Sequence, residues 1–263
     1  MIGKKKINQI KSLIQKKNRL KENLFLIEGD KIVLEVANSR FRIKELFATS
    51  EFIYKNNYLP NNIDRIIEVS YEDLRKASLL KHPQQSLALC YLPHEEILPS
   101  RMEGISFYLD GIQDPGNLGT ILRTADWFGM NHLYCSPDTV DIFNPKVIQS
   151  SMGSFIRIKT FYTPFDELAE QAYHNNISLF GTFMEGENIY QAQLLCPSIL
   201  VLGNEGNGIR QGVAKKIKNR LHIPSFKSGL KQPESLNVAV AAGILASEFM
   251  RRPFIKAPIQ NES

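Results

Sequence analysis

The stretch DGIQDPGNLGTILRTADWFG, residues 110–129, follows the apolar run ISFYL and opens a helical pattern. Pro115 and Gly116 turn the chain, which indicates a strand joined to a helix by a short loop. Asn117 is a good helix cap, and Gly119 lets another backbone come close. Neither the G-x-G-x-x-G nor the G-x-x-x-x-G-K-[ST] spacing is present, so the loop predicts no dinucleotide site and no P-loop.

Arg123 lies about one and a half turns into this helix, from where its guanidinium can reach back toward the strand end. A capped helix with a surface arginine explains the same residues equally well. The first loop therefore assigns no function by itself.

Two further glycine-containing loops follow predicted strands. In SILVLGNEGNGI, residues 198–209, three glycines leave the backbone around Glu205 exposed to a ligand. In LHIPSFKSGLKQPESLNVAVAAGILASEF, residues 221–249, Ser235 and Asn237 lie in the first turn of an apolar helix that we expect to be buried. Each loop also has a purely structural explanation. The first can be a turn followed by the start of a helix, and the polar residues of the second can be helix caps.

The chain around these loops alternates between strand-like and helix-like runs. Strands are predicted at ISFYLD, NHLYCS, FIRIKTFY, ISLFGTF, SILVLG and RLHIP, and helices at GTILRTADWFG, NPKVIQSSM, FDELAEQAYHNN, GIRQGVAKKIKN and from about Pro233 to Arg252. This alternation predicts an α/β fold whose parallel sheet is covered on both faces. Ligands in such sheets bind beyond the carboxyl ends of the strands, so we expect the three loops to converge on one pocket.

A small α/β unit is predicted before this domain. It begins with a basic amphipathic helix at residues 6–18, with Ile7, Ile10 and Ile14 facing inward. The predicted elements that follow are the strands LFLIEG, IKELFAT, RIIEV and SLALCYL and the helices DKIVLEVANS and YEDLRKAS. Prolines, charges and the lack of a period mark residues 92–104 as a connection. We therefore expect domains at residues 1–95 and 105–263, with residues 96–104 as the linker.

Positive charge is concentrated at the N-terminus. Residues 1–22 hold eight Lys and Arg residues against Glu22 alone, whereas the whole chain carries a net charge of +5. Such a block predicts contacts with nucleic-acid phosphates, and a solvated helix face is the other explanation. The candidate RNA-binding residues are Lys4, Lys5, Lys6, Lys16, Lys17 and Arg19.

Several protein classes are not supported by the sequence. No apolar run approaches the roughly 18–20 residues that span a membrane, and the N-terminus lacks the apolar core of a secretory signal. Cys90, Cys135 and Cys196 lie far apart, without C-x-x-C or H-x-x-x-H spacing, so we expect neither disulfides nor a metal site. Each cysteine lies beside apolar residues, which predicts a buried free thiol. These features favour a cytoplasmic protein.

Taken together, the three loops resemble the SpoU (TrmH-like) family of RNA ribose methyltransferases, in the SPOUT superfamily. The matching motifs are D-P-G-N-x-G-x-x-x-R-T-A-x-x-F-G, V-L-G-N-E-G-x-G and I-P…E-S-L-N-V-A-V-A, with NPKVIQSSMGS between them. They are spread over residues 105–252. Residues 1–95 resemble, through KKxRxKENxFLIEGxKIVxE, the RNA-binding domain similar to certain ribosomal proteins that often precedes this catalytic domain.

This resemblance implies a parallel-sheet domain with a deep trefoil knot, and a homodimer whose site is completed across the interface. It implies S-adenosylmethionine as the methyl donor, bound in the knot largely by backbone groups. By the same resemblance, the cofactor-binding positions are Leu202, Gly203, Asn204, Glu205, Gly208, Ile223, Ser235, Leu236 and Asn237. The catalytic positions are Arg123, Asn117, Glu205, Ser235 and Asn237.

The family assigns the activation of the ribose 2′-hydroxyl to the arginine at Arg123. A free arginine is nearly always protonated, which favours stabilisation of the developing alkoxide over a role as the base. The loop between Ile223 and Ser235 is longer than the family pattern and adds Lys227 and Lys231, which are either RNA contacts or solvated charges.

Ribosomal RNA is the preferred substrate because the two-domain layout is common among ribosomal RNA methyltransferases, and transfer RNA is the alternative. Three other functions compete with this one. They are an RNA-binding or assembly factor of the same fold without transfer activity, a methyltransferase that acts on a base, and an unrelated nucleotide-binding α/β enzyme. The presence of all five predicted catalytic residues favours the ribose methyltransferase.

Overall fold

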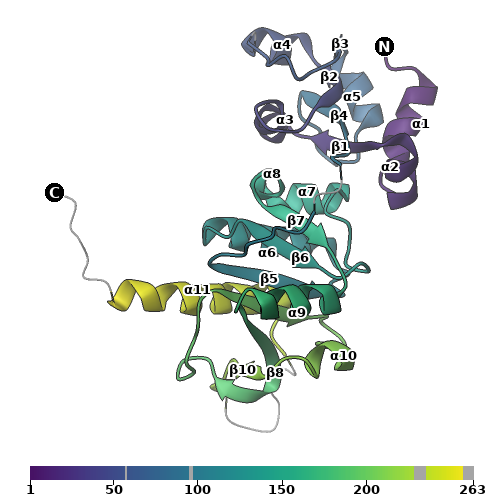
Figure 1. Cartoon of the computed structure of the whole chain (residues 1–263). Helices are drawn as coiled ribbons and strands as arrows, with labels where there is room; N and C mark the ends of the chain where they lie inside the picture. The colour runs from purple at the N-terminus through teal and green to yellow at the C-terminus, as the bar shows by residue number, and fades with distance from the viewer. Residues whose placement is uncertain (57, 95–96, 228–234, 257–263) are drawn as a thin grey trace, which may run out of the picture. The chain divides into compact units, whose positions relative to one another are not determined.

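The structure, a computed structural model, describes residues 1–56, 58–94, 97–227 and 235–256, with the backbone alone from residue 252 onward (Figure 1). The chain forms two compact units. The first combines Met1–Glu95 with Asp141–Ile156, and the second combines Glu96–Val140 with Arg157–Ser263. The short segment 141–156 therefore packs with the N-terminal unit, although the predicted catalytic domain flanks it in sequence.

The first unit is built on a four-stranded sheet with the order β1-β4-β2-β3. Its strands are β1 (Leu24–Glu28), β2 (Ile43–Ala48), β3 (Ile66–Glu68) and β4 (Ser86–Tyr91), and β4 runs antiparallel to both β1 and β2. Its helices are α1 (Lys4–Ser12), α2 (Lys16–Glu22), α3 (Asp30–Ala37), α4 (Ser50–Lys55) and α5 (Tyr71–Ala77). One face of the sheet packs against α1 and α5, and α3 lies on the other (Figure 1).

The basic N-terminal segment forms two short helices instead of the single helix predicted at residues 6–18. α1 ends at Ser12, and α2 begins at Lys16 after a turn. Leu13 in this turn is fully buried, whereas Ile14, predicted to face inward, is 53% exposed. The helical repeat did not reveal the turn because both residues are apolar and either one can face a core.

Arg19, predicted to bind RNA, is instead buried in the first unit and only 1% exposed. Its Nε donates to the Asp141 carboxylate at 3.0 Å, and a terminal nitrogen forms an ion pair with the same carboxylate. The other terminal nitrogen donates to the carbonyl oxygens of Leu13 and Ile14 at 2.8 and 2.9 Å. The turn after α1 leaves these carbonyls without helical partners, and Arg19 satisfies them. Its assignment to RNA binding is therefore wrong.

Aromatic rings join segment 141–156 to the first unit. Phe143 and Phe155 lie 4.6 and 6.5 Å from the ring centre of Phe25. Gln149 also donates to the carbonyl oxygen of Glu28 at 2.9 Å. The segment contains α7 (Pro145–Ser151) and most of α8 (Ser154–Arg157).

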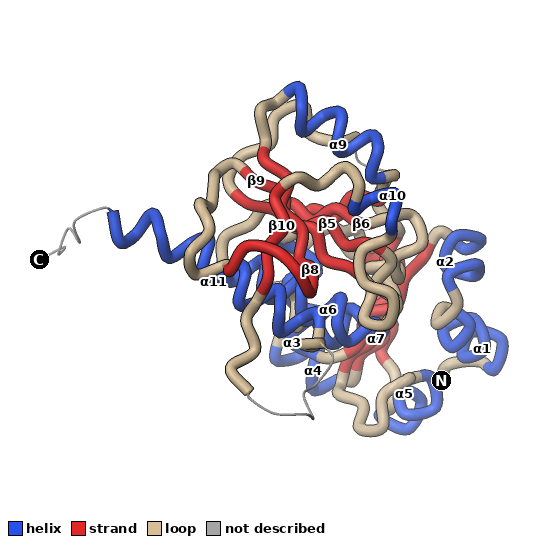
Figure 2. Tube along the Cα trace, turned by 90° about the horizontal axis from the view of Figure 1, so that it is seen from below, coloured by secondary structure: helices blue, strands red, loops and turns tan. Residues whose placement is uncertain are grey.

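The second unit is a six-stranded sheet with the order β10-β8-β9-β5-β6-β7, in which every neighbouring pair is parallel. Its strands are β5 (Ile105–Asp110), β6 (His132–Cys135), β7 (Lys159–Tyr162), β8 (Ser178–Asn188), β9 (Ser198–Gly203) and β10 (Asn219–His222). Figure 2 shows α6 (Pro115–Trp127) and α11 (Val238–Lys256) on one side, and α9 (Phe165–His174) and α10 (Gln211–Ala214) on the other. The predicted parallel sheet covered on both faces is confirmed.

Some predicted elements of this unit differ from the structure. The first half of FIRIKTFY, predicted as a strand, belongs largely to α8, and only Lys159–Tyr162 pairs in the sheet. α10 is a single turn with Lys215 as its C-cap, so it is much shorter than the predicted helix GIRQGVAKKIKN. The final helix begins at Val238, and its predicted start at Pro233 lies outside the described residues, as does Lys231.

The three cysteines are free thiols. Cys90 and Cys135 are buried, as predicted. Cys196 is exposed, because it lies in the connection before β9 rather than in the strand itself, so the prediction of a third buried thiol is wrong. No helix among the described residues is long and apolar enough to cross a membrane.

Replacing Arg19 with Leu is expected to lower the free energy of unfolding by about 3–5 kcal/mol, because the partly buried Asp141 carboxylate and two carbonyls lose their donor. Equilibrium urea unfolding measures this change. The matched control is Lys17→Leu on the same helix, where the side chain is exposed and the expected change is within about 0.5 kcal/mol. Equal losses in the two variants would contradict the structural role of Arg19.

Candidate active site

α6 begins earlier than predicted, and this places Asn117 inside its first turn. Asp114 caps the helix, because its carboxylate accepts the backbone N–H of Asn117 at 2.8 Å. Pro115 follows at the first helical position, where its missing N–H has no helical partner to lose. The prediction that Asn117 is the cap is therefore wrong, and its side chain bonds elsewhere.

Asn117 connects the three loops that the sequence singled out. Its amide nitrogen donates to the carboxylate of Glu205, and its amide oxygen accepts from the amide nitrogen of Asn237 at 3.0 Å. These side chains follow β5, β9 and β10 respectively. The structure thus brings together Asn117, Glu205 and Asn237 from the predicted catalytic set.

The orientation of Asn237 is fixed by α11. Its amide oxygen accepts the backbone N–H groups of Ala239 and Val240 at 3.0 and 3.3 Å, so Asn237 caps the helix instead of lying in its first turn as predicted. With the oxygen bound in this way, the amide nitrogen is the group that meets Asn117. The hydrogen-bonded chain from α11 through Asn237 and Asn117 to Glu205 therefore has a single consistent direction.

Gly203 ends β9 at a point where two stretches of backbone nearly touch. A Cβ atom at this position would lie 2.1 Å from the carbonyl carbon of Gly208 and 2.2 Å from the nitrogen of Ile209. Beyond it, the backbones of Asn204 and Gly208 exchange two hydrogen bonds, at 3.1 and 2.8 Å, and close the loop that carries Glu205. Only glycine fits here without a shift of the backbone.

Asn204 ties this loop to the neighbouring strand. Its amide nitrogen donates to the carbonyl oxygen of Gly111 at 2.9 Å, just beyond β5. Its amide oxygen accepts the backbone N–H groups of Gly206 and Asn207 at 2.9 and 3.3 Å. Asn204 therefore shapes the loop, and its exposed neighbours are left to meet a ligand.

An ion pair with a buried carboxylate, not predicted from the sequence, fixes the far end of the same loop. Asp110, 1% exposed, accepts from the backbone N–H of Arg210 at 2.7 Å and from its Nε at 2.6 Å. The guanidinium also pairs with Asp138 at 3.3 Å. Hydrogen bonding to Asp110 raises the pKa of Arg210, and hydrogen bonding from Ser136 lowers the pKa of Asp138. The sequence feature that could have drawn attention to Asp110 is its position as a single carboxylate at the end of an apolar strand.

Arg123 lies apart from the Asn117 network. Its side chain is exposed on α6 and makes no ion pair or hydrogen bond within the described part of the chain. It follows Asn117 by six residues, which corresponds to about 9 Å along the helix and to a different side of it. Ser235 is also exposed and has no hydrogen-bond partner among the described residues. One chain alone thus does not unite all the predicted catalytic residues.

Comparison with known proteins agrees with this geometry. The model of the SpoU rRNA Methylase family matches residues 104–247, over the second unit and segment 141–156. The chain belongs to this family. The model of the MRM3-like substrate binding domain matches residues 4–88, in the first unit.

Relatives of the SpoU family cover nearly the whole chain. The 23S rRNA (guanosine(2553)-2′-O)-methyltransferase RlmP of Bacillus subtilis is 32% identical, with 91% of this chain and 94% of that protein aligned. A structure from Porphyromonas gingivalis, described as an RNA methyltransferase of the TrmH family, is 40% identical, with a TM-score of 0.85 and coverage of 96% and 99%. An AdoMet-bound rRNA methyltransferase from Sinorhizobium meliloti is 25% identical, with a TM-score of 0.80 and 94% of both chains covered.

Family membership confirms the predicted class of enzyme, an RNA 2′-O-ribose methyltransferase that uses S-adenosylmethionine, and its α/β fold. The trefoil knot and the homodimer stay predictions. Likewise, the individual roles given to the site residues stay predictions, although the positions of Asn117, Glu205 and Asn237 favour them.

The residues at the strand ends fit S-adenosylmethionine. Leu236, next to Asn237, is 49% exposed, and Ile223, just beyond β10, is half-buried, so both offer apolar surface. The loop from Asn204 to Gly208 presents polar backbone, and Glu205 adds an exposed carboxylate. Apolar surface, backbone groups and a negative charge suit an adenosine joined to a positively charged sulfonium.

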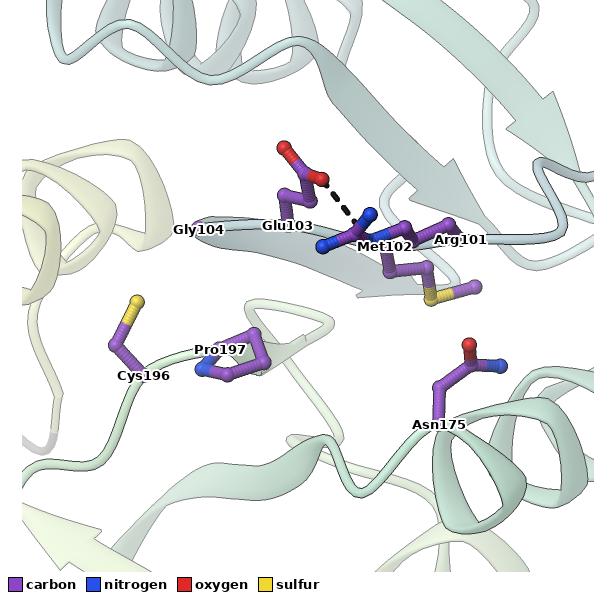
Figure 3. Close-up of a pocket in the computed structure, with 7 residues that line it drawn as sticks. All are labelled: Arg101, Met102, Glu103, Gly104, Asn175, Cys196 and Pro197. Carbon is purple, nitrogen blue, oxygen red and sulfur yellow. Dashed lines mark ion pairs between the residues drawn. The ribbon is translucent and has the colours of Figure 1, made fainter.

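A separate cavity of about 490 Å³ lies near the amino ends of β5 and β9, at the end of the sheet opposite the network (Figure 3). Its lining consists of Arg101, Met102, Glu103, Gly104, Asn175, Cys196 and Pro197. None of these is a predicted site residue. Ligands of parallel sheets bind at the carboxyl ends, so this cavity is not the candidate active site.

Replacing Gly203 with Ala is expected to lower the free energy of unfolding by about 3 kcal/mol, because a methyl group would overlap the backbone of Gly208. Affinity for S-adenosylhomocysteine, measured by titration calorimetry, should fall as well. The control in the same loop is Gly206→Ala, whose Cβ would meet only the Asn204 side chain, at 3.4 Å. Normal stability and affinity in Gly203→Ala would refute the close crossing.

Proposed function

We propose that this protein transfers a methyl group from S-adenosylmethionine to a ribose 2′-hydroxyl of 23S ribosomal RNA. The observation that carries this proposal is the hydrogen-bonded chain Asn237–Asn117–Glu205, which joins three loops at the carboxyl ends of the sheet. The substrate follows from relatives named as 23S rRNA 2′-O-methyltransferases, including RlmP of Bacillus subtilis and RlmB of Neisseria meningitidis.

The chemistry requires a better nucleophile than a free hydroxyl. S-adenosylmethionine supplies, when bound, a methyl group that its positive sulfonium makes electrophilic. In the transfer, the 2′-oxygen would gain the methyl group as the methyl–sulfur bond breaks and S-adenosylhomocysteine leaves, and the hydroxyl proton would pass to solvent water. Because the amides of Asn117 and Asn237 are bonded at both ends, they hold Glu205 and the ribose in place with little reorganisation.

Arg123 is the proposed electrostatic partner of the 2′-oxygen. A protonated guanidinium cannot accept the hydroxyl proton, but it donates hydrogen bonds to the oxygen as negative charge develops. Its exposed side chain, which lacks an acidic partner among the described residues, leaves its donors available for RNA. This role explains why the residue is a cation and why no described residue of its own chain neutralises it.

We further propose that a second copy of the chain brings Arg123 to the Asn117 network. Arg123 and Asn117 of one chain lie on different sides of α6, about 9 Å apart along its axis. A groove of about 400 Å³ on α11, which begins just after Asn237, offers a surface for that copy. Val240 and Gly243 line this groove, and Val240 is 51% exposed. An exposed apolar helix face beside an incomplete site is typical of a symmetric dimer interface.

We propose that residues 1–95 bind RNA and that the protein is located in the cytoplasm. Lys4, Lys5, Lys16 and Lys17 are exposed and suit phosphate contacts. Lys6 is partly committed, because its Nζ pairs with Glu45 at 2.7 Å. The free thiols of the chain fit a reducing compartment.

Replacing Arg123 with Ala is expected to lower kcat by at least about 100-fold, because a donor to the developing alkoxide is lost. The assay measures labelled methyl transfer from S-adenosylmethionine to total RNA from a strain lacking this protein. Affinity for S-adenosylhomocysteine should stay nearly unchanged.

The control for this experiment is Arg101→Ala, an exposed arginine at the opposite end of the sheet. Nucleoside digestion then identifies the product. Label in a methylated base would exclude ribose transfer, and label in transfer RNA would replace the proposed substrate. Near-normal turnover of Arg123→Ala would refute the role of Arg123.

A site shared between chains also predicts complementation. Arg123→Ala and Asn117→Ala are each expected to be inactive alone. After the two are mixed, unfolded and refolded together, about a quarter of the wild-type sites should return, because half of the dimers are mixed and each has one intact site. No recovery despite dimers of normal mass would show that the site lies within one chain.

A further inference from the structure

A second group of cations lies on the sheet of the first unit, outside the N-terminal block. We call it the Tyr91 cluster, and it consists of Arg42, Lys44, Asp64 and Tyr91. The guanidinium carbon of Arg42 lies 5.8 Å from the centre of the Tyr91 ring, and Nζ of Lys44 lies 5.7 Å from it. Both distances are within the range of cation–π attraction.

Hydrogen bonds fix this cluster in one arrangement. The hydroxyl of Tyr91 donates to Asp64 at 3.2 Å, and Nε of Arg42 donates to the same carboxylate at 2.7 Å. The side chain of Arg42 is nevertheless 68% exposed. Lys44 makes no ion pair with any described residue. The cluster therefore holds an exposed guanidinium and an ammonium beside the same ring, which reduces the entropic cost of binding.

The sheet register places Tyr91, the centre of this cluster, on the same face as α1. Tyr91 pairs with Leu24, and Glu45 on β2 pairs with Leu89, so these side chains share one face of the sheet. That face packs against α1, and Tyr91 itself packs against the same core. Lys6 of α1 bonds to Glu45 at 2.7 Å, next to Lys44. The lysines at the start of α1 and the Tyr91 cluster thus lie along one continuous surface.

From this placement we propose that the Tyr91 cluster is an RNA phosphate-binding site, in which Arg42 and Lys44 extend the RNA contact of α1 onto the sheet. This inference rests on the proposed function and adds residues that the charge pattern of the N-terminus does not contain. Arginine and lysine are the side chains that bind phosphate oxygens most strongly. Asp64 and Tyr91 act as positioning residues, because they hold the guanidinium.

The test compares the intact protein with the double variant Arg42→Gln, Lys44→Gln, using a 23S rRNA transcript. Loss of two phosphate contacts is expected to lower the slope of log affinity against log salt by about 1.5. KM for RNA in the methyl-transfer assay should rise, while kcat and the melting temperature stay unchanged.

A matched control removes the same charge elsewhere in the unit. Lys31→Gln, Lys55→Gln changes two exposed lysines on α3 and α4, and α3 lies on the other side of the sheet (Figure 1). This pair should leave the salt slope nearly unchanged. Tyr91→Leu leaves the net charge unchanged but removes the ring that holds Arg42 and Lys44. We expect this variant to bind RNA more weakly than the wild-type protein.

Equal losses in the two double variants would overturn the proposal, because net charge alone would then explain them. Wild-type transfer with an unchanged salt slope in Arg42→Gln, Lys44→Gln would also overturn it, while leaving the proposed function intact. A wild-type protein that neither binds nor methylates RNA would overturn both.

Discussion

The close passage of the Gly203 backbone over Gly208 is the constraint on which the candidate site depends. With no Cβ at Gly203, the chain leaves β9, loops through Glu205 and returns almost onto itself. This compact return keeps Glu205 near the end of β5, where α6 presents Asn117. The ion pair between Asp110 and Arg210 fixes the end of the same loop to β5. A larger residue at Gly203 would displace all of these partners, because the obstructing atoms belong to the backbone and cannot rotate away.

Helix caps connect this backbone geometry to the chemistry. Asp114 caps α6, which releases the side chain of Asn117, and Asn237 caps α11 with its oxygen, which turns its nitrogen outward. Each cap serves an unsatisfied N–H group, so the amides are oriented by the requirements of helix ends. The chain's own helix ends therefore orient the network. Preorganised donors of this kind are effective in catalysis because they need not reorganise as charge develops.

Local patterns in the sequence were sufficient for much of the fold. The alternation of apolar strands and helical runs predicts the parallel sheet, and glycine-rich strand ends predict where the loops converge. The errors arise where two residues satisfy the same rule. Asp114 and Asn117 are both capping types, and Leu13 and Ile14 are both apolar, so only packing selects between them. The Asp110–Arg210 pair joins residues 100 positions apart, and a single sequence contains no signal for such a pairing.

Charge shows the same limit most clearly, because a count of lysines and arginines treats every cation as equivalent. Arg19 lies within the basic block, yet its guanidinium already donates hydrogen bonds to Asp141 and to two carbonyl oxygens. Arg42 lies outside the block, yet it remains 68% exposed while bonded to Asp64. Arg210 fixes a loop, whereas Arg123 has no partner among the described residues. What distinguishes these four arginines is how many of their donors the fold already uses. The donors that remain available decide which of them can meet RNA.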